Sequence, residues 1–109
     1  MPSELELTFY SLWDIHYPNI DLHTEHRFAK PRRFRFDLAH LPTKIAIEIQ
    51  GSIWSGGRHT RGSGLLNEYT KMNLAAALGW RVFYLCTNTV NDEAIYHQIA
   101  AAIRETKSI

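Results

Sequence analysis

Two adjoining stretches, Arg33-Phe-Arg-Phe-Asp-Leu-Ala39 and Lys44-Ile-Ala-Ile-Glu-Ile-Gln50, decide the fold of this chain. Both alternate polar and apolar residues, and the turn signal Leu41-Pro42-Thr43 lies between them, so the pattern predicts a β-hairpin. A turn centred on the last two residues of that signal pairs positions whose numbers add up to 85, which places Asp37 opposite Glu48. Like charges directly across a sheet are destabilising, and a bound cation would remove the repulsion.

The same alternation assigns the hairpin side chains to two faces. Asp37, Glu48 and Gln50 share one surface. The apolar side chains are expected to face a core: Phe34, Phe36, Leu38, Ile45, Ile47 and Ile49. Mg²⁺ prefers carboxylate, carbonyl and water oxygens, so Asp37, Glu48 and the backbone carbonyl of Ile49 could form a minimal magnesium site. The alternative is a pair of surface carboxylates paired with Arg35 or Lys44 on the same face.

The composition of the chain is typical of one globular domain spanning residues 1–109, with a mass of 12.6 kDa. Hydrophobic residues make up 45% of it, enough to form a core. No apolar run approaches the roughly 20 residues that span a bilayer, and the first residues do not resemble a signal peptide. The lone Cys86 cannot form an internal disulfide. We therefore expect a cytoplasmic protein without a membrane role.

The remaining pattern predicts the other elements. Helices are expected at residues 4–15, after residue 63 and from residue 91, and strands at residues 25–28 and 81–86. Ser3 and Glu6 form a capping box for the first helix. The unbroken apolar run of the last strand indicates burial on both faces. This order predicts an α/β fold, a small mixed β-sheet flanked by helices in the order α-β-β-β-α-β-α.

The second helix is predicted to turn one apolar stripe towards the sheet, formed by Leu65, Tyr69, Met72 and Ala76. Asn67 and Lys71 lie four residues apart and share another face, which could point at the hairpin. There Lys71 could steady a nucleophilic water or a charged transition state. Alternatively, it pairs with a neighbour on the helix surface.

Basic residues gather in two short stretches, Arg32, Arg33 and Arg35 in the first and Arg58, His59 and Arg61 in the second. Such donors suit phosphate oxygens, and the glycines of the second stretch permit close backbone approach. Both stretches are therefore candidate nucleic-acid-binding segments. The alternatives are a solvated charged strand and a surface loop with incidental charge. The histidines lack the spacing of zinc ligands, and no nucleotide-binding glycine motif is present.

Several separated blocks of the chain resemble, in the right order, the PD-(D/E)XK nuclease superfamily. They are Arg33–Asp37, Lys44–Gly51, Trp54–Gly62, and Lys71–Asn73 with Gly79–Val82. The blocks are most similar to small phage and bacterial members related to Holliday junction resolvases and very-short-patch-repair endonucleases. The resemblance implies a restriction-endonuclease-like core, which agrees with the order of elements given above.

The resemblance implies that Asp37 and Glu48 bind Mg²⁺, for which Mn²⁺ can substitute, and that Glu6, His59 and Lys71 are auxiliary catalytic residues. Glu6 would reach the metal through water, although its capping role explains it without a metal. Gln50 stands where the family commonly has lysine, and could orient the attacking water. Because glutamine carries no charge, Lys71, Arg58 or His59 would have to supply the missing positive charge.

The implied activity is metal-dependent hydrolysis of DNA phosphodiester bonds by an endonuclease. A small domain has little surface for reading a long base sequence, so we favour structure-selective cutting of branched DNA such as four-way junctions, in recombination or repair. Cuts on two strands of a junction need two active sites and imply a homodimer. The open alternatives are a mismatch-nicking or homing-type endonuclease of the same fold, and a module that binds nucleic acid without cutting it.

Overall fold

The computed structural model describes residues 2–51 and 62–106 of the chain. Its elements are α1 (Glu4–His16), β1 (His23–Arg27), β2 (Arg35–His40), β3 (Ile45–Ile49), α2 (Gly62–Ala77), β4 (Arg81–Leu85) and α3 (Glu93–Glu105). A single 3₁₀ turn, Leu41–Thr43, joins β2 to β3. The predicted α/β order is confirmed, and the bounds of the elements lie close to those expected. Within the described ranges, no helix has the length and apolar content to cross a membrane.

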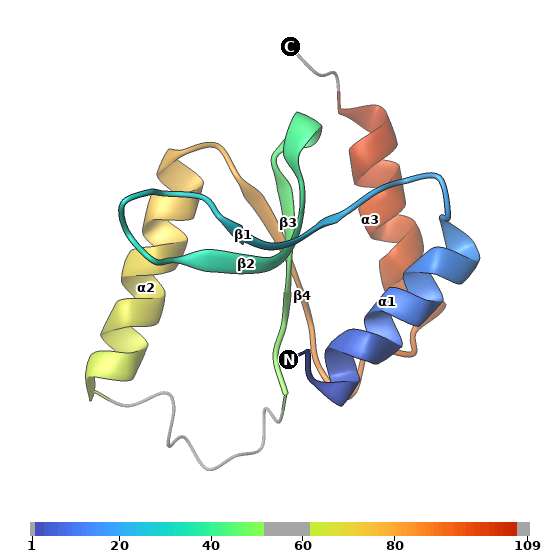
Figure 1. Ribbon diagram of the computed structural model, residues 1–109, viewed down its shortest axis with the longest axis horizontal. Helices are drawn as coiled ribbons and strands as arrows, with labels where there is room; N and C mark the ends of the chain where they lie inside the picture. The colour runs from blue at the N-terminus through green and yellow to red at the C-terminus, as the bar shows by residue number, and fades with distance from the viewer. Residues whose placement is uncertain (1, 52–61, 107–109) are drawn as a thin grey trace.

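The four strands form one mixed sheet in the order β1-β2-β3-β4. β1, β2 and β3 are antiparallel neighbours, whereas β3 and β4 run parallel, with α2 between them in the sequence. Leu38 pairs with Ile47 and His40 with Ile45, which confirms the hairpin register expected from the sequence. Figure 1 shows α2 over one face of the sheet, and α1 and α3 over the other.

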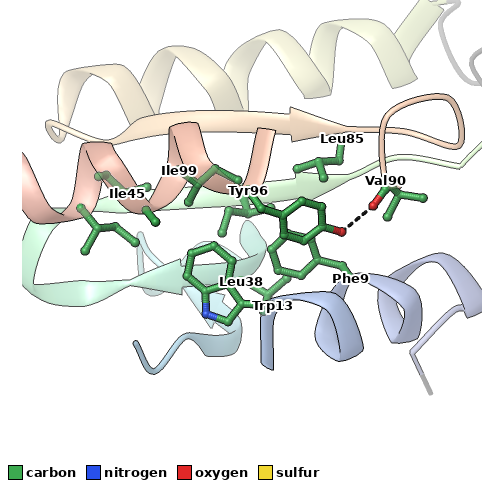
Figure 2. Close-up of a cluster of buried hydrophobic side chains, with 11 residues drawn as sticks. Phe9, Trp13, Leu38, Ile45, Leu85, Val90, Tyr96 and Ile99 are labelled. Carbon is green, nitrogen blue, oxygen red and sulfur yellow. Dashed lines mark hydrogen bonds between the residues drawn. The ribbon is translucent and has the colours of Figure 1, made fainter. Parts of the chain in front are cut away.

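The larger core lies between the sheet and the helices α1 and α3 (Figure 2). Ring centroids are 5.8 Å apart for Phe9 and Trp13 and 5.1 Å apart for Phe9 and Tyr96, so an aromatic cluster joins the two helices. Ser3 and Glu6 form the predicted capping box of α1, and Asp92 caps α3. The cap side chain of each helix therefore accepts one backbone N–H of its first turn, and one face of each helix packs in the core.

Tyr96 carries a buried hydrogen bond whose loss should be measurable. Its hydroxyl donates to the backbone carbonyl of Val90 at 2.6 Å (Figure 2), and burial raises the pKa of Tyr96 to about 12. Tyr96→Phe leaves that carbonyl without its donor, so we expect a loss of about 1–3 kcal/mol in the free energy of unfolding, measured in urea by circular dichroism. Tyr69→Phe, at an exposed position of α2, is the control. Equal losses in the two variants would contradict the prediction.

The opposite face of the sheet has a smaller cluster, formed by Phe36, Ala39, Ala46 and Ala75 with Phe28, Trp80 and Val82 around it. The prediction that Phe36 and Leu38 face the same core is wrong, because Leu38 packs in the larger core and Phe36 under α2. Paired positions between β2 and β3 end at Leu38, and the regular alternation of β2 is lost at Asp37. Phe34 belongs to neither cluster and is half-buried.

The face that α2 turns to the sheet differs from the predicted stripe. Tyr69 is 56% exposed and Ala76 is exposed, whereas Ala75 is fully buried and the side chain of Lys71 is only 14% exposed. The sheet surface below α2 presents Phe36, Ala46 and the carboxylate of Glu48. The small Ala75 packs in that cluster, and Lys71 pairs with the carboxylate. The expectation that β4 is covered on both faces is also wrong at Tyr84, which is 48% exposed.

Candidate active site

Asp37 and Glu48 meet where β2 and β3 stop exchanging ordinary ladder bonds. The backbone N–H of Asp37 donates to Oε2 of Glu48 at 3.1 Å, and the backbone N–H of Ile49 donates to Oδ2 of Asp37 at 2.7 Å. Each carboxylate is thus held by the backbone of the opposite strand. These side-chain bonds lie at the point where the β2–β3 pairing ends and the alternation of β2 is lost.

Glu48 is buried, with 5% of its surface exposed, and forms an ion pair with Lys71. The ammonium group of Lys71 donates to Oε1 of Glu48 from the inner face of α2. Burial raises the pKa of Glu48, and the charge of Asp37 raises it further, whereas the hydrogen bond and charge of Lys71 act in the opposite direction. Lys71 therefore pairs with a carboxylate on β3 and not, as in the alternative drawn from its helical neighbours, with a residue of its own helix.

The alternative of two solvated carboxylates with basic neighbours does not describe this pair. Arg35 forms an ion pair with Glu25 at 2.8 Å, and Lys44 donates to the backbone carbonyl of Leu78 at 2.9 Å. In the described parts of the chain, no three His, Cys, Asp or Glu side chains converge. A divalent ion would therefore rely on two carboxylates completed by backbone oxygens and water, the ligand set in which Mg²⁺ is usually bound. In the structure, the positive charge beside Glu48 is supplied by Lys71.

Two other predicted residues lie apart from the carboxylate pair. Gln50 is exposed just beyond β3, and its backbone N–H extends the parallel ladder to the carbonyl of Leu85 at 2.8 Å. Glu6 stays in α1, where Oε1 accepts the backbone N–H of Ser3 at 3.2 Å and Oε2 accepts the hydroxyl of Tyr10 at 3.5 Å. The capping role of Glu6 is therefore observed, and the structure does not bring its carboxylate into a metal-binding group.

The predicted nucleic-acid-binding residues fall in two groups. Arg58, His59 and Arg61 lie outside the described residues, as does Trp54. Arg32, Arg33 and Arg35 are exposed at the connection from β1 to β2 and at the start of β2. Of these, Arg35 is paired with Glu25, and Arg32 lies over the ring of Phe34 with its guanidinium carbon 4.6 Å from the centroid.

Two tyrosines beside the carboxylates were missed. Tyr84 pairs with Glu48 in the parallel register, so both side chains point to the α2 face. Burial raises the pKa of Tyr84, as do the nearby Glu48 and Glu68; burial likewise raises the pKa of Tyr10, with Glu6 and Asp37 adding to it. Both tyrosines are thus close to the acidic groups. Tyr84 lies beside Glu48 because of the register between β3 and β4, which the apolar pattern of β4 does not specify. Tyr10 lies on α1, which is distant in sequence from both carboxylates.

The fold and the carboxylate–lysine group together define an α/β domain in which the half-buried Asp37 and the buried Glu48 lie beside Lys71 of α2. No family model and no curated protein matches the chain. Among solved structures, the homing endonuclease I-Bth0305I catalytic domain is similar, with a TM-score of 0.66 and 19% sequence identity over 93% of this chain and 94% of that chain. At this identity the likeness concerns the fold, so the chain has the fold of a nuclease catalytic domain.

Proposed function

We propose that this chain is a Mg²⁺-dependent DNA endonuclease that hydrolyses phosphodiester bonds at the Asp37–Glu48 pair, with Mn²⁺ able to substitute. The observation that carries the proposal is the arrangement of Asp37, Glu48 and Lys71, two adjacent carboxylates with a mostly buried lysine beside them. Burying the ammonium group of a lysine costs free energy. A lysine with no role in the site would avoid that cost by staying in solvent. The fold shared with an endonuclease catalytic domain supports the same conclusion.

The residues have distinct roles in this proposal. A divalent ion at the pair would make hydroxide available near neutral pH and offset charge on the phosphate. Asp37 and Glu48 are held for this purpose by backbone N–H groups. Lys71 supplies the positive charge that Gln50 lacks and can donate a hydrogen bond to a phosphate oxygen. Gln50, exposed beyond β3, can orient a water. His59 stays a candidate proton donor, and Glu6 is assigned to helix capping.

The preferred substrate is branched DNA such as a four-way junction, cut by a homodimer. Support comes from the basic connection between β1 and β2, whose positive charges suit a DNA backbone. The second candidate is a mismatch-nicking or homing-type endonuclease, which the fold of the homing endonuclease domain favours. A module that binds DNA without cutting it is the third.

A cleavage assay tests the activity and the substrate together. We expect labelled four-way junctions to be cut in Mg²⁺ faster than matched duplex or single strands, with cutting lost in EDTA and restored when Mg²⁺ is added back. A mismatched duplex that is nicked faster than the junction would favour the second candidate. Binding without cleavage in both Mg²⁺ and Mn²⁺ would overturn the nuclease proposal.

A further inference from the structure

The end of the β1–β2 hairpin carries a series of ring contacts that runs from the core to the surface. Phe36 is fully buried and stacks on Phe28, with centroids 4.1 Å apart and planes 7° from parallel. Phe28 stacks in turn on the half-buried Phe34 at 6.5 Å and 18°. The exposed guanidinium of Arg32 lies 4.6 Å from the centre of Phe34. We call Phe36, Phe28, Phe34 and Arg32 the aromatic series.

Hydrogen bonds within the connection fix the outer end of this series. Nη2 of Arg27 donates to the backbone carbonyls of Pro31 and Arg32 at 3.4 and 3.3 Å. The backbone N–H of Arg32 donates to the carbonyl of Ala29 at 2.9 Å. The backbone that carries Arg32 is therefore held in place before any ligand arrives, which lowers the conformational entropy lost on binding.

The charge around the aromatic series suits a polyanion. Residues 27–35 include five basic residues and no acidic residue. The ion pair seen there, in the described part of the chain, joins Arg35 to Glu25. The exposed plane is the guanidinium of Arg32, which is backed by the half-buried ring of Phe34. Planar cationic and aromatic groups among positive charges are the features with which proteins bind the bases and backbone of single-stranded nucleic acid.

The inner end of the aromatic series lies next to the candidate active site. Nζ of Lys71, which pairs with Glu48, is 5.8 Å from the ring centroid of Phe36. Figure 1 shows the β1–β2 connection on the side of the sheet that α2 covers. DNA at the carboxylate pair could therefore contact the outer end of the series, only two ring contacts from Phe36.

We propose that Phe34 and Arg32 form a stacking platform for an unpaired DNA base near the cleaved bond, an inference that rests on the proposed function. Bases in a continuous duplex are covered on both faces by their neighbours, so a free face exists only where a base is unpaired or extruded. The platform therefore selects bulges, mismatches and branch points with an exposed base over continuous duplex. In this proposal Arg32 stacks on the base, whereas Arg33 contacts phosphate.

Binding measured without divalent metal tests the platform. Two labelled DNAs of the same sequence would carry 2-aminopurine, either unpaired in a bulge or paired in a duplex. We expect tighter binding and stronger quenching with the bulge. Phe34→Leu keeps apolar contact with Phe28 but loses the aromatic plane, so it should weaken bulge binding about tenfold with little effect on duplex. Phe34→Trp should restore it, and Arg33→Ala should weaken binding of both DNAs equally.

The outcomes separate the platform from the nuclease activity. Equal affinity of the unmodified protein for the two DNAs, or a Phe34→Leu effect common to both, would overturn the platform. Circular dichroism melting shows whether Phe34→Leu is folded, and the rescue by tryptophan excludes a general packing effect. A protein that prefers the bulge but never cuts would overturn the nuclease proposal alone. A nuclease whose Phe34→Leu variant binds the bulge normally would overturn the platform alone.

Discussion

Asp37→Asn is expected to slow DNA cleavage by at least about a hundredfold while DNA affinity stays close to that of the unmodified protein. The backbone N–H of Ile49 donates to Oδ2 of Asp37, and the amide oxygen of asparagine can accept the same bond. The substitution therefore keeps the junction of β2 and β3 and removes one negative charge from the pair. A divalent ion would lose half of its carboxylate ligands, and the effect should fall on the chemical step.

Single-turnover cleavage in Mg²⁺ measures the rate, and fluorescence anisotropy in EDTA measures the affinity. Asp14→Asn is the matched control, because Asp14 is an exposed aspartate on α1, and α1 and α2 cover opposite faces of the sheet (Figure 1). We expect Asp14→Asn to cut at the normal rate. Normal cutting by Asp37→Asn would remove the carboxylate pair from the proposed active site, whereas loss of DNA affinity would show that Asp37 acts mainly in folding or binding.

The hairpin could be predicted from the sequence because its determinants are local. A short connection, Leu41–Thr43, fixes which residues of β2 and β3 face each other, and the alternating residues leave one register with the isoleucines of β3 inside. The capping box at Ser3 and Glu6 is local in the same sense and fixed the start of α1. Placing Asp37 beside Glu48 therefore needed no information about distant parts of the chain.

The rest of the site depends on contacts between distant elements. Lys71 faces the sheet because the surface below α2 presents Ala46 and Glu48, and a helical pattern with apolar residues on several faces does not reveal this. Tyr84 lies beside Glu48 only because β3 and β4 run parallel in one particular register. The alternation of β2 is lost at Asp37, where side-chain hydrogen bonds lie that period-two reasoning does not include.

Lys71→Met is expected to lower the free energy of unfolding by about 3 kcal/mol at pH 7 and to slow cleavage strongly. The variant leaves the buried Glu48 without its cation. Protonation would relieve the charge, and neutralising a carboxyl with an ordinary pKa of 4.5 at pH 7 costs about 3 kcal/mol, which sets the scale of the loss. Full cleavage activity would exclude Lys71 as the replacement for the family lysine.

The loss should depend on pH with a definite sign. Burial raises the pKa of Glu48 in the folded state, and removing Lys71 takes away two influences that lower it. The folded variant therefore binds a proton more readily than the unfolded chain, so stability falls as pH rises from about 4.5 through the raised pKa. Urea unfolding in EDTA should show a large deficit at pH 7 that shrinks towards pH 5. A deficit that does not change with pH would contradict the buried ion pair.

The double variant Glu48→Gln with Lys71→Met separates stability from catalysis. It removes both buried charges, and glutamine can still accept the backbone N–H of Asp37, so most of the lost stability should return. Cleavage should stay absent, because neither the carboxylate nor the ammonium group is restored. Lys44→Met is the control: its lysine is exposed, and its loss should cost less than about 1 kcal/mol at either pH. A double variant as unstable as Lys71→Met would mean that Lys71 stabilises the fold by packing rather than by its charge.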